Sequence, residues 1–163
     1  MKRVLLKLSG EALAGEKKTG FDEATCIQVA KQVKREQLDA ARILRPCGAL
    51  AARQTLNVQV GSLHAAGWAT PEGELTDVLE DVGRHNALDK LFGRLALAGR
   101  LGEPGFVIMT SRTSYELVRK CARLGVPAFA TISAPTALAL QLAQEAGMHL
   151  WAMCRPPTAL RYA

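Results

Sequence analysis

The pattern of hydrophobic and polar residues predicts alternating strands and helices in the second half of the chain. Apolar runs at 106–109, 128–132 and 149–153 have the length of buried strands. Apolar residues at helical spacing follow the first two runs, over about 113–124 and 136–146. Because this alternation is typical of layered α/β domains, we expect that architecture for the chain.

An antiparallel hairpin is predicted ahead of these alternating elements. Residues 62–69 and 74–81 have the composition of strands, and Pro71-Glu72-Gly73 between them is typical of a turn. The expected fold is therefore α/β, a layered sheet with helices in which an antiparallel hairpin precedes the alternating strands and helices.

Three local features complete the predicted elements. Residues 37–56 predict a helical region that is interrupted at Pro46-Cys47-Gly48, so we expect Cys47 to be exposed. Thr113, with Glu116 three residues later, predicts a capping box at the start of a helix. The last ten residues, from Cys154 onward, show no regular pattern and are expected to be irregular.

The sequence EDVGRHNALDKL at 80–91 joins a turn to a polar helix start. Gly83 gives the turn conformational freedom of the backbone. Arg84 and His85 fall in the first turn of a helix that is expected to continue to about residue 98. The free N–H groups of a first helical turn attract anions, and the two basic side chains strengthen that attraction. Residues 80–91 therefore fit either an anion site or a capped helix with a solvated, charged end.

Similar polar clusters follow the other predicted strands. They are TSRTS at 110–114, SAPT at 133–136 and MCRPPT at 153–158. In open α/β sheets the carboxyl edge of the strands is where ligands bind, so we expect one shared anion pocket there. The residues that would bind the phosphate groups of its ligand are Arg84, Arg112 and Arg155. The alternative interpretation makes the serines and threonines ordinary helix N-caps.

Charge favours a phosphate-bearing small molecule as the ligand. The formal net charge is +6, which indicates an acidic partner. Basic runs with interleaved aromatic residues are missing, which argues against nucleic acid. No apolar run is long enough to span a membrane, and the opening residues lack the pattern of a signal peptide, so we expect a cytoplasmic protein without membrane contact.

Cysteine and histidine spacing does not predict a metal site. The cysteines stand at 26, 47, 121 and 154, with no CxxC pair, so four free thiols are expected. His64 lies in a sequence similar to the H-x-E element of zinc deaminases, but Ala66 replaces the glutamate. We therefore expect no bound metal.

The choice of basic residue divides the chain into two predicted parts. Residues 1–35 contain six Lys and two Arg, whereas 36–163 contain two Lys and eleven Arg. We therefore predict an N-terminal arm over 1–36 and a domain over 37–163. The opening MKRVLLKLSGEALAG resembles the start of bacterial UMP kinase, which implies ATP contacts for Lys7, Ser9 and Gly10. A kinase fragment and a natural or artificial fusion both remain open.

The domain resembles the C-terminal part of the FdhD/NarQ family, the formate dehydrogenase accessory sulfurtransferases. The matching stretches are EDVGRHNALDKL at 80–91, His64-Ala65-Ala66, Gln54, Ser111-Arg112 with Glu116 and Lys120, Gly125-Val126-Pro127, SAPTALA at 133–139 and the MCR sequence at 153–155. The resemblance implies a cytidine-deaminase-like fold and a sulfur carrier. Such a carrier takes sulfur from a cysteine desulfurase and passes it to the molybdenum bis(molybdopterin guanine dinucleotide) cofactor of formate dehydrogenase. A homodimer is also implied.

By position, the resemblance assigns the cofactor-binding segment to 153–158. The full set of expected binding residues comprises that segment and the polar clusters, namely Met153, Cys154, Arg155, Pro156, Pro157, Thr158, Arg84, His85, Ser111, Arg112, Ser133 and Thr136. No catalytic residue is assigned, because the family's CGxC-type loop upstream of Gln54 has no match in this sequence. The alternative to sulfur transfer is a module that binds the guanine-nucleotide cofactor without passing sulfur.

Overall fold

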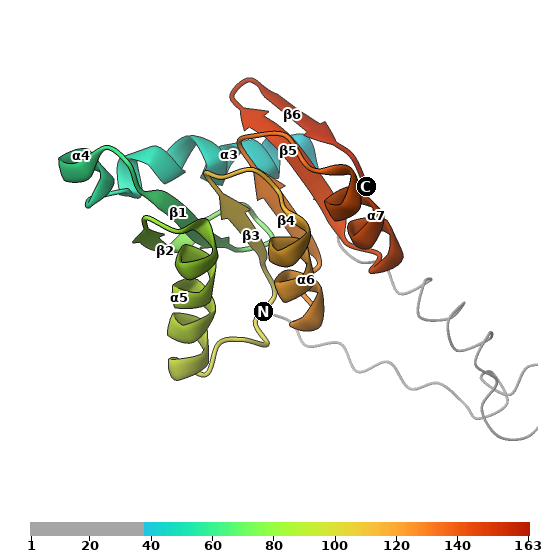
Figure 1. Cartoon of the computed structure of the whole chain (residues 1–163), viewed down its shortest axis with the longest axis horizontal. Coiled ribbons are helices and arrows are strands. Elements are labelled where there is room, and N and C mark those ends of the chain that lie inside the picture. Colours follow the sequence, from blue (N-terminus) through green and yellow to red (C-terminus); the bar gives the residue numbers. More distant parts are fainter. Residues whose placement is uncertain (1–37) are drawn as a thin grey trace, which may run out of the picture. The chain divides into compact units, whose positions relative to one another are not determined.

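A six-stranded sheet organises residues 38–163, the part of the chain that the computed structural model describes (Figure 1). In spatial order its strands are β2 (Leu75–Asp81), β1 (His64–Ala69), β3 (Phe106–Met109), β4 (Ala128–Thr131), β5 (His149–Arg155) and β6 (Thr158–Arg161). Strand β1 is antiparallel to both neighbours, whereas β3, β4 and β5 are parallel and β6 turns back on β5. The predicted division at residue 36, and the elements expected before it, lie outside the described residues.

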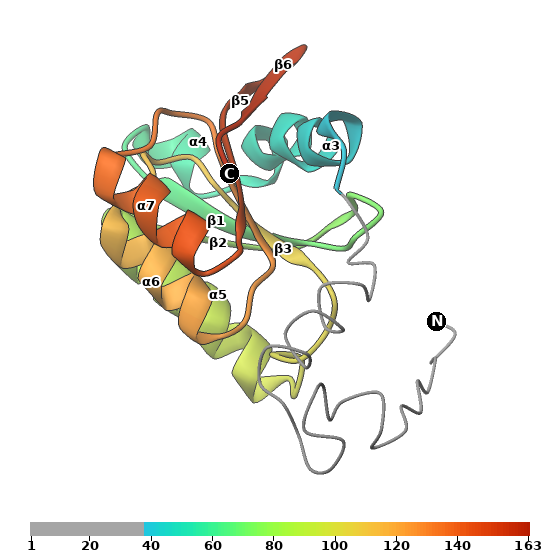
Figure 2. The same cartoon turned by 90° about the vertical axis from the view of Figure 1, so that its right-hand side faces the viewer.

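Helices cover both faces of this sheet. They are α3 (Ala40–Leu50), the short 3-10 turn η2 (Ala51–Arg53), α4 (Asn57–Val60), α5 (Arg84–Leu97), α6 (Tyr115–Arg123) and α7 (Ala137–Glu145). Figure 2 shows α5, α6 and α7 side by side on one face and α3 on the other. The predicted α/β class, with a hairpin followed by alternating strands and helices, is confirmed. No helix within residues 38–163 is long and apolar enough to cross a membrane.

Alternation along the strands creates two apolar cores. Successive strand residues point to opposite faces, so Val107 and Met109 pack towards α5–α7 while Phe106 and Ile108 pack towards α3. Because both faces are covered, the central strands are buried along their length, as in other α/β proteins. Strand β1 also needs a small residue, since a Cβ on Gly67 would lie 2.8 Å from Leu75 Cδ1.

The expected interruption at Pro46-Cys47-Gly48 was wrong. Helix α3 runs through it, beginning after Asp39, whose side chain accepts a hydrogen bond from the backbone N–H of Arg42 (2.8 Å). A proline inside a helix costs about 3 kcal/mol. The apolar face of α3, which includes Ile43, Cys47 and Leu50 in the core, offsets that cost. Cys47 is only 7% exposed, so its expected exposure was also wrong.

Two other local predictions are corrected by the structure. Helix α6 begins at Tyr115 rather than Thr113, because the Thr113 hydroxyl is buried and lies 2.7 Å from the hydroxyl of Thr131. The predicted capping box is therefore not formed. Cys154–Ala163 is not irregular: β5 extends to Arg155, and β6 pairs with it as an antiparallel hairpin.

Candidate functional site

The carboxyl edge of the sheet gathers the polar clusters that follow separate strands. Strands β2, β3, β4 and β5 all run in the same direction and end there, since β2 and β3 are both antiparallel to β1. Strand β1 begins at this edge, where His64 pairs with Asp81. The topology thus brings together segments that are far apart in the sequence, as expected for a ligand edge in an α/β sheet.

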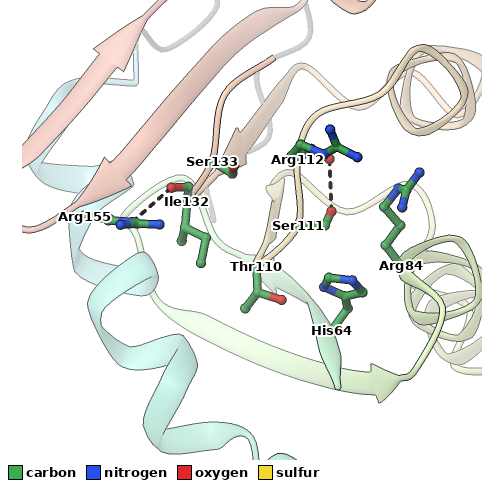
Figure 3. Close-up of a pocket in the computed structure, with 8 residues that line it drawn as sticks. All are labelled: His64, Arg84, Thr110, Ser111, Arg112, Ile132, Ser133 and Arg155. Atoms are coloured by element: carbon green, nitrogen blue, oxygen red, sulfur yellow. Dashed lines mark hydrogen bonds between the residues drawn. The ribbon is translucent and has the colours of Figure 1, made fainter. Parts of the chain in front are cut away.

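A pocket of about 350 Å³ lies at this edge (Figure 3). It is lined by His64, Arg84, Thr110, Ser111, Arg112, Ile132, Ser133 and Arg155. In Figure 3 the side chains of Arg84 and Arg112 lie on one side of the pocket and that of Arg155 on the other, with His64 and Thr110 between them. Its volume falls in the range of small-molecule sites. The lining contains no carboxylate and no thiol, so its chemistry favours anions.

A tightly bonded turn sets the position of Arg84. The Asp81 carboxylate accepts from the backbone N–H of Gly83 (2.9 Å) and the side-chain amide of Asn86 (3.2 Å), and it pairs with Lys90 at 2.6 Å. The hydrogen bond from Lys90, with those from Gly83 and Asn86, lowers the pKa of Asp81 to about 2. Because Arg84 is the first residue of α5, this turn directs its side chain to the pocket.

The pocket arginines, Arg84, Arg112 and Arg155, form no ion pair within residues 38–163. The charge of Arg84 is nevertheless one of the smaller causes, after hydrogen bonds from the backbone of Glu116 and from Ser114, that lower the pKa of Glu116. The Nε of Arg84 is buried without a hydrogen-bond partner in this part of the chain. Burial and then the charge of Arg84 lower the pKa of His64. Buried donors are normally satisfied, so an anionic group in the pocket would supply what these residues lack.

Hydroxyl groups fix the backbone that surrounds the pocket. The Thr110 hydroxyl accepts from the backbone N–H of Ala65 (2.9 Å), which ties the end of β3 to β1. Ser111 donates to the carbonyl of Arg112 (3.1 Å). The Thr131 hydroxyl donates to the carbonyl of Ser133 (3.0 Å) at the end of β4. These bonds hold the loops in place, and Arg155 adds one more by donating from Nε to the carbonyl of Ile132 (3.2 Å) (Figure 3).

The structure brings some of the predicted binding residues into the pocket and places the others elsewhere. The lining includes Arg84, Ser111, Arg112, Ser133 and Arg155. Thr136 is the N-cap of α7, accepting from the N–H of Ala139 (3.3 Å), as the alternative interpretation predicted. The remaining predicted residues do not line it; they are His85, Met153, Cys154, Pro156, Pro157 and Thr158.

Three lining residues are absent from the predicted binding set, namely His64, Thr110 and Ile132, and His64 is the one with an ionisable side chain. The zinc-deaminase comparison and the family resemblance both include His64, but neither assigns it to the anion pocket, and the strand that carries it is predicted to begin at residue 62. An antiparallel β1 delivers its first residue, rather than its last, to the carboxyl edge of the parallel strands. Applying that rule to the predicted hairpin would have placed His64 at the site.

The cysteines of the described region are buried away from the pocket lining. Cys47 and Cys154 lie in the core beneath α3, and Cys121 lies in the core beneath α5–α7. No group of three or more potential metal ligands occurs within residues 38–163.

Comparisons with known proteins connect this architecture to one family. The model of the FdhD/NarQ family matches residues 2–163, which includes the stretch whose opening resembles UMP kinase. The chain is 54% identical over 117 residues to the sulfur carrier protein FdhD of Chromobacterium violaceum, covering 72% of this chain and 43% of that protein. It is 41% identical over 165 residues to the Bordetella parapertussis protein of the same name, covering 98% of this chain and 60% of that one.

A solved structure shares the fold. The crystal structure of a Desulfotalea psychrophila protein described as a formate dehydrogenase accessory protein matches with a TM-score of 0.68 and 34% identity. The match covers 75% of this chain and 54% of that one. The chain spans about half the length of the curated relatives it matches.

Proposed function

The chain belongs to the FdhD/NarQ family, and on that premise we propose that it acts in sulfur carriage for formate dehydrogenase, with its pocket binding a guanine-nucleotide cofactor. The proposed substrate is molybdenum bis(molybdopterin guanine dinucleotide). The proposed partners are a cysteine desulfurase, which supplies persulfide sulfur, and formate dehydrogenase, which receives the cofactor.

The observation that carries this proposal is the unpaired positive charge of the pocket. Arg84, Arg112 and Arg155 come from three different segments and have no ion-pair partner within residues 38–163. A diphosphate supplies several acceptor oxygens and at least two negative charges, which suits guanidinium groups on both sides of the pocket. His64 contributes one further donor, and in the free protein burial and then Arg84 lower its pKa, which disfavours its charged form.

The proposed role of these residues is to hold and orient the nucleotide end of the substrate. Arginines neutralise the phosphates, and hydroxyl-braced loops keep the arginines in place before the ligand arrives. Such preorganisation lowers the entropic cost of binding. The cofactor's molybdenum end, where sulfur is needed, would extend from this anchored nucleotide.

Titration with GDP tests the pocket. Isothermal calorimetry on the full chain is expected to show one GDP per chain and at least tenfold weaker binding of guanosine, which lacks phosphates. Arg84→Ala is expected to weaken GDP binding about 10- to 100-fold, because a hydrogen bond to a charged group contributes about 1.5–3 kcal/mol. Arg94→Ala, at the other end of α5, is the matched control and should leave the affinity within about twofold. Equal losses in both variants would contradict the assignment.

A binding module that passes no sulfur is the second candidate function. It is favoured by the burial of all three cysteines in the described region and by their absence from the pocket lining. Persulfide trapping after incubation with a cysteine desulfurase and cysteine separates the two candidates. Sulfane sulfur on a cysteine of this chain supports sulfur carriage, whereas GDP binding without any trapped persulfide supports the binding module.

A further inference from the structure

A buried carboxyl group lies near the pocket but does not line it. Glu80, near the end of β2, pairs with Ala65, the residue after His64. Its side chain is buried, with 8% exposure of the residue, and no ion pair within residues 38–163 involves it. Burial of a carboxyl group is unfavourable unless hydrogen bonds replace the lost water, so the bonds that Glu80 makes should explain its place.

The two oxygens of this carboxyl group bind the start of α4. Oε2 accepts a hydrogen bond from the backbone N–H of Leu56 (2.8 Å), and Oε1 accepts one from the backbone N–H of Asn57 (2.9 Å). Leu56 is the N-cap of α4, and its apolar side chain cannot bind these N–H groups. Because so short a helix is not stable alone, Glu80 supplies from β2 the cap that the local sequence lacks.

The same hydrogen bonds extend to the residue directly before His64. The backbone N–H of Leu63 donates to Asn57 Oδ1 (2.8 Å), and the Leu63 carbonyl accepts from Gln54 Nε2 (3.4 Å). Gln54 is buried, and its Nε2 also donates to Glu80 Oε1 (3.5 Å). Both polar groups of the Leu63 backbone are therefore held by residues that are themselves bonded to Glu80.

The residue after His64 is held as well. The backbone N–H of Ala65 donates to the hydroxyl of Thr110 (2.9 Å). His64 and Thr110 both line the pocket and lie between the arginines in Figure 3. The backbone at His64 is thus fixed through its two neighbours in the chain, by Thr110 on one side and by the hydrogen bonds of Glu80 on the other.

Two consecutive carboxyl groups at the end of β2 therefore support different pocket residues. Asp81 binds the turn that precedes Arg84, whereas Glu80 binds the segment that precedes His64. Successive side chains of a strand point to opposite faces of the sheet, which lets the two groups reach different segments.

We propose that Glu80 is a positioning residue, which holds residues 54–63 so that His64 enters the pocket, without touching the ligand itself. The contribution of His64 to nucleotide binding rests on the proposed function. The dependence of His64 on Glu80 does not, because it follows from hydrogen bonds within the chain.

Imidazole signals in a 1H–13C NMR spectrum of the ligand-free full chain test the positioning directly. Asn57→Ala removes the acceptor of the Leu63 N–H at a partly buried position outside the core. This variant is expected to shift the His64 signals, while those of His149, at the start of β5, stay in place. Gln59→Ala, at an exposed position of the same helix, is the matched control and should shift neither.

Glu80→Gln tests the carboxyl group itself. The amide keeps one acceptor oxygen but places a donor where the second backbone N–H needs an acceptor, so the His64 signals should again shift. Glu74→Gln makes the same change of charge in the turn between β1 and β2 and should leave them in place. Unchanged His64 signals in folded Glu80→Gln and Asn57→Ala proteins, or equal shifts in the controls, would overturn the proposal. If Glu80→Gln does not fold, Asn57→Ala decides.

GDP affinity, measured by calorimetry, shows whether the positioning matters for binding. Asn57→Ala is expected to weaken GDP binding about two- to tenfold, the effect of one impaired hydrogen bond to the ligand. In a His64→Ala background the same substitution should change the affinity by less than about twofold, because the residue it positions is gone. Equal losses in both backgrounds would overturn the role of this network in binding. A parent protein that does not bind GDP would contradict the proposed function, and the NMR result would still decide the positioning of His64.

Discussion

The two ends of α5 carry arginines in opposite electrostatic settings. Beyond its carboxyl end, Arg100 pairs with Asp77 and Glu103, at 2.8 Å in each case, and Arg94 lies 3.8 Å from Asp77. At its amino end, Arg84 faces the pocket with no ion-pair partner within residues 38–163 and with a buried, unsatisfied Nε. Arginines thus form ion pairs within the chain near the carboxyl end of α5, whereas the arginine at its amino end is available to bind an anionic ligand.

This difference distinguishes charged side chains that stabilise the fold from charged side chains that can bind a ligand. An ion pair satisfies both partners inside the folded chain, so its removal is felt as lost stability. Unpaired guanidinium groups that converge on a pocket repel one another, so their removal costs the fold little and costs an anionic ligand a great deal. Substitutions at the two ends of α5 should therefore change ligand affinity and stability separately.

Removing all three pocket arginines should have the largest effect. The variant Arg84→Ala, Arg112→Ala, Arg155→Ala is expected to bind GDP at least about 100-fold more weakly, because several charge-assisted hydrogen bonds are lost. Calorimetry measures the affinity. The double variant Arg94→Ala, Arg100→Ala removes paired arginines and should change GDP affinity by less than about threefold. A large loss in that control would show that net charge, rather than the pocket, determines binding.

The paired end of α5 should respond in stability. Arg100→Ala is expected to lower the free energy of unfolding by about 1 kcal/mol, measured by urea denaturation at pH 7, since it breaks a partly buried pair. Burial favours a higher pKa for Asp77, but hydrogen bonds from Thr76 and Arg100 lower it overall. The stabilisation is therefore present above the ordinary Asp value of 3.8 and is lost as the pH falls through the lowered value.

Arg84→Ala is the matched variant for this stability measurement. Its free energy of unfolding should stay within about 0.5 kcal/mol of the parent, because no ion pair is removed. A loss of stability equal to that of Arg100→Ala would show that Arg84 is a structural residue.

A smaller effect is expected from His64 and pH. Its pKa is lowered by burial and by Arg84, so the imidazole is neutral in the free protein at pH 7. A bound phosphate counteracts Arg84 and raises that pKa, so binding takes up a proton and GDP affinity should rise as the pH falls towards the lowered pKa of the free imidazole. NMR titration of the imidazole with and without GDP measures both values. His64→Gln should remove this pH dependence, and an unchanged profile would exclude His64 from the site.

Strand positions and the ligand edge were predictable because they depend on local patterns. Apolar runs such as 106–109 fixed the strands, and the polar residues after them had to converge once the strands were parallel. The features that the sequence did not predict depend on tertiary packing. Burial of Cys47 kept Pro46 inside a helix, and the exposed edge strand β6 has no apolar alternation that would distinguish it from a loop.

The sequence did not predict a bulge in β5 at Met153, where the pairing with β6 shifts register and the backbone is left-handed with φ of 54°. After the bulge, side chains point to the face of the sheet opposite to the one that regular alternation predicts. Cys154 therefore lies in the core beneath α3, and Arg155 lines the pocket. No local pattern of residues marks that reversal. The predicted cofactor segment at 153–158 therefore contributes a single lining residue in the structure.

We propose that a phosphorylated guanine nucleotide binds among Arg84, Arg112 and Arg155. The most direct measurement follows the arginine Nε–H signals by 15N–1H NMR while GDP is added to the full chain. We expect the signals of Arg84, Arg112 and Arg155 to shift together and saturably, while those of Arg94 and Arg100 stay in place. Saturable shifts confined to the paired arginines, or none at GDP concentrations that saturate binding, would contradict the account.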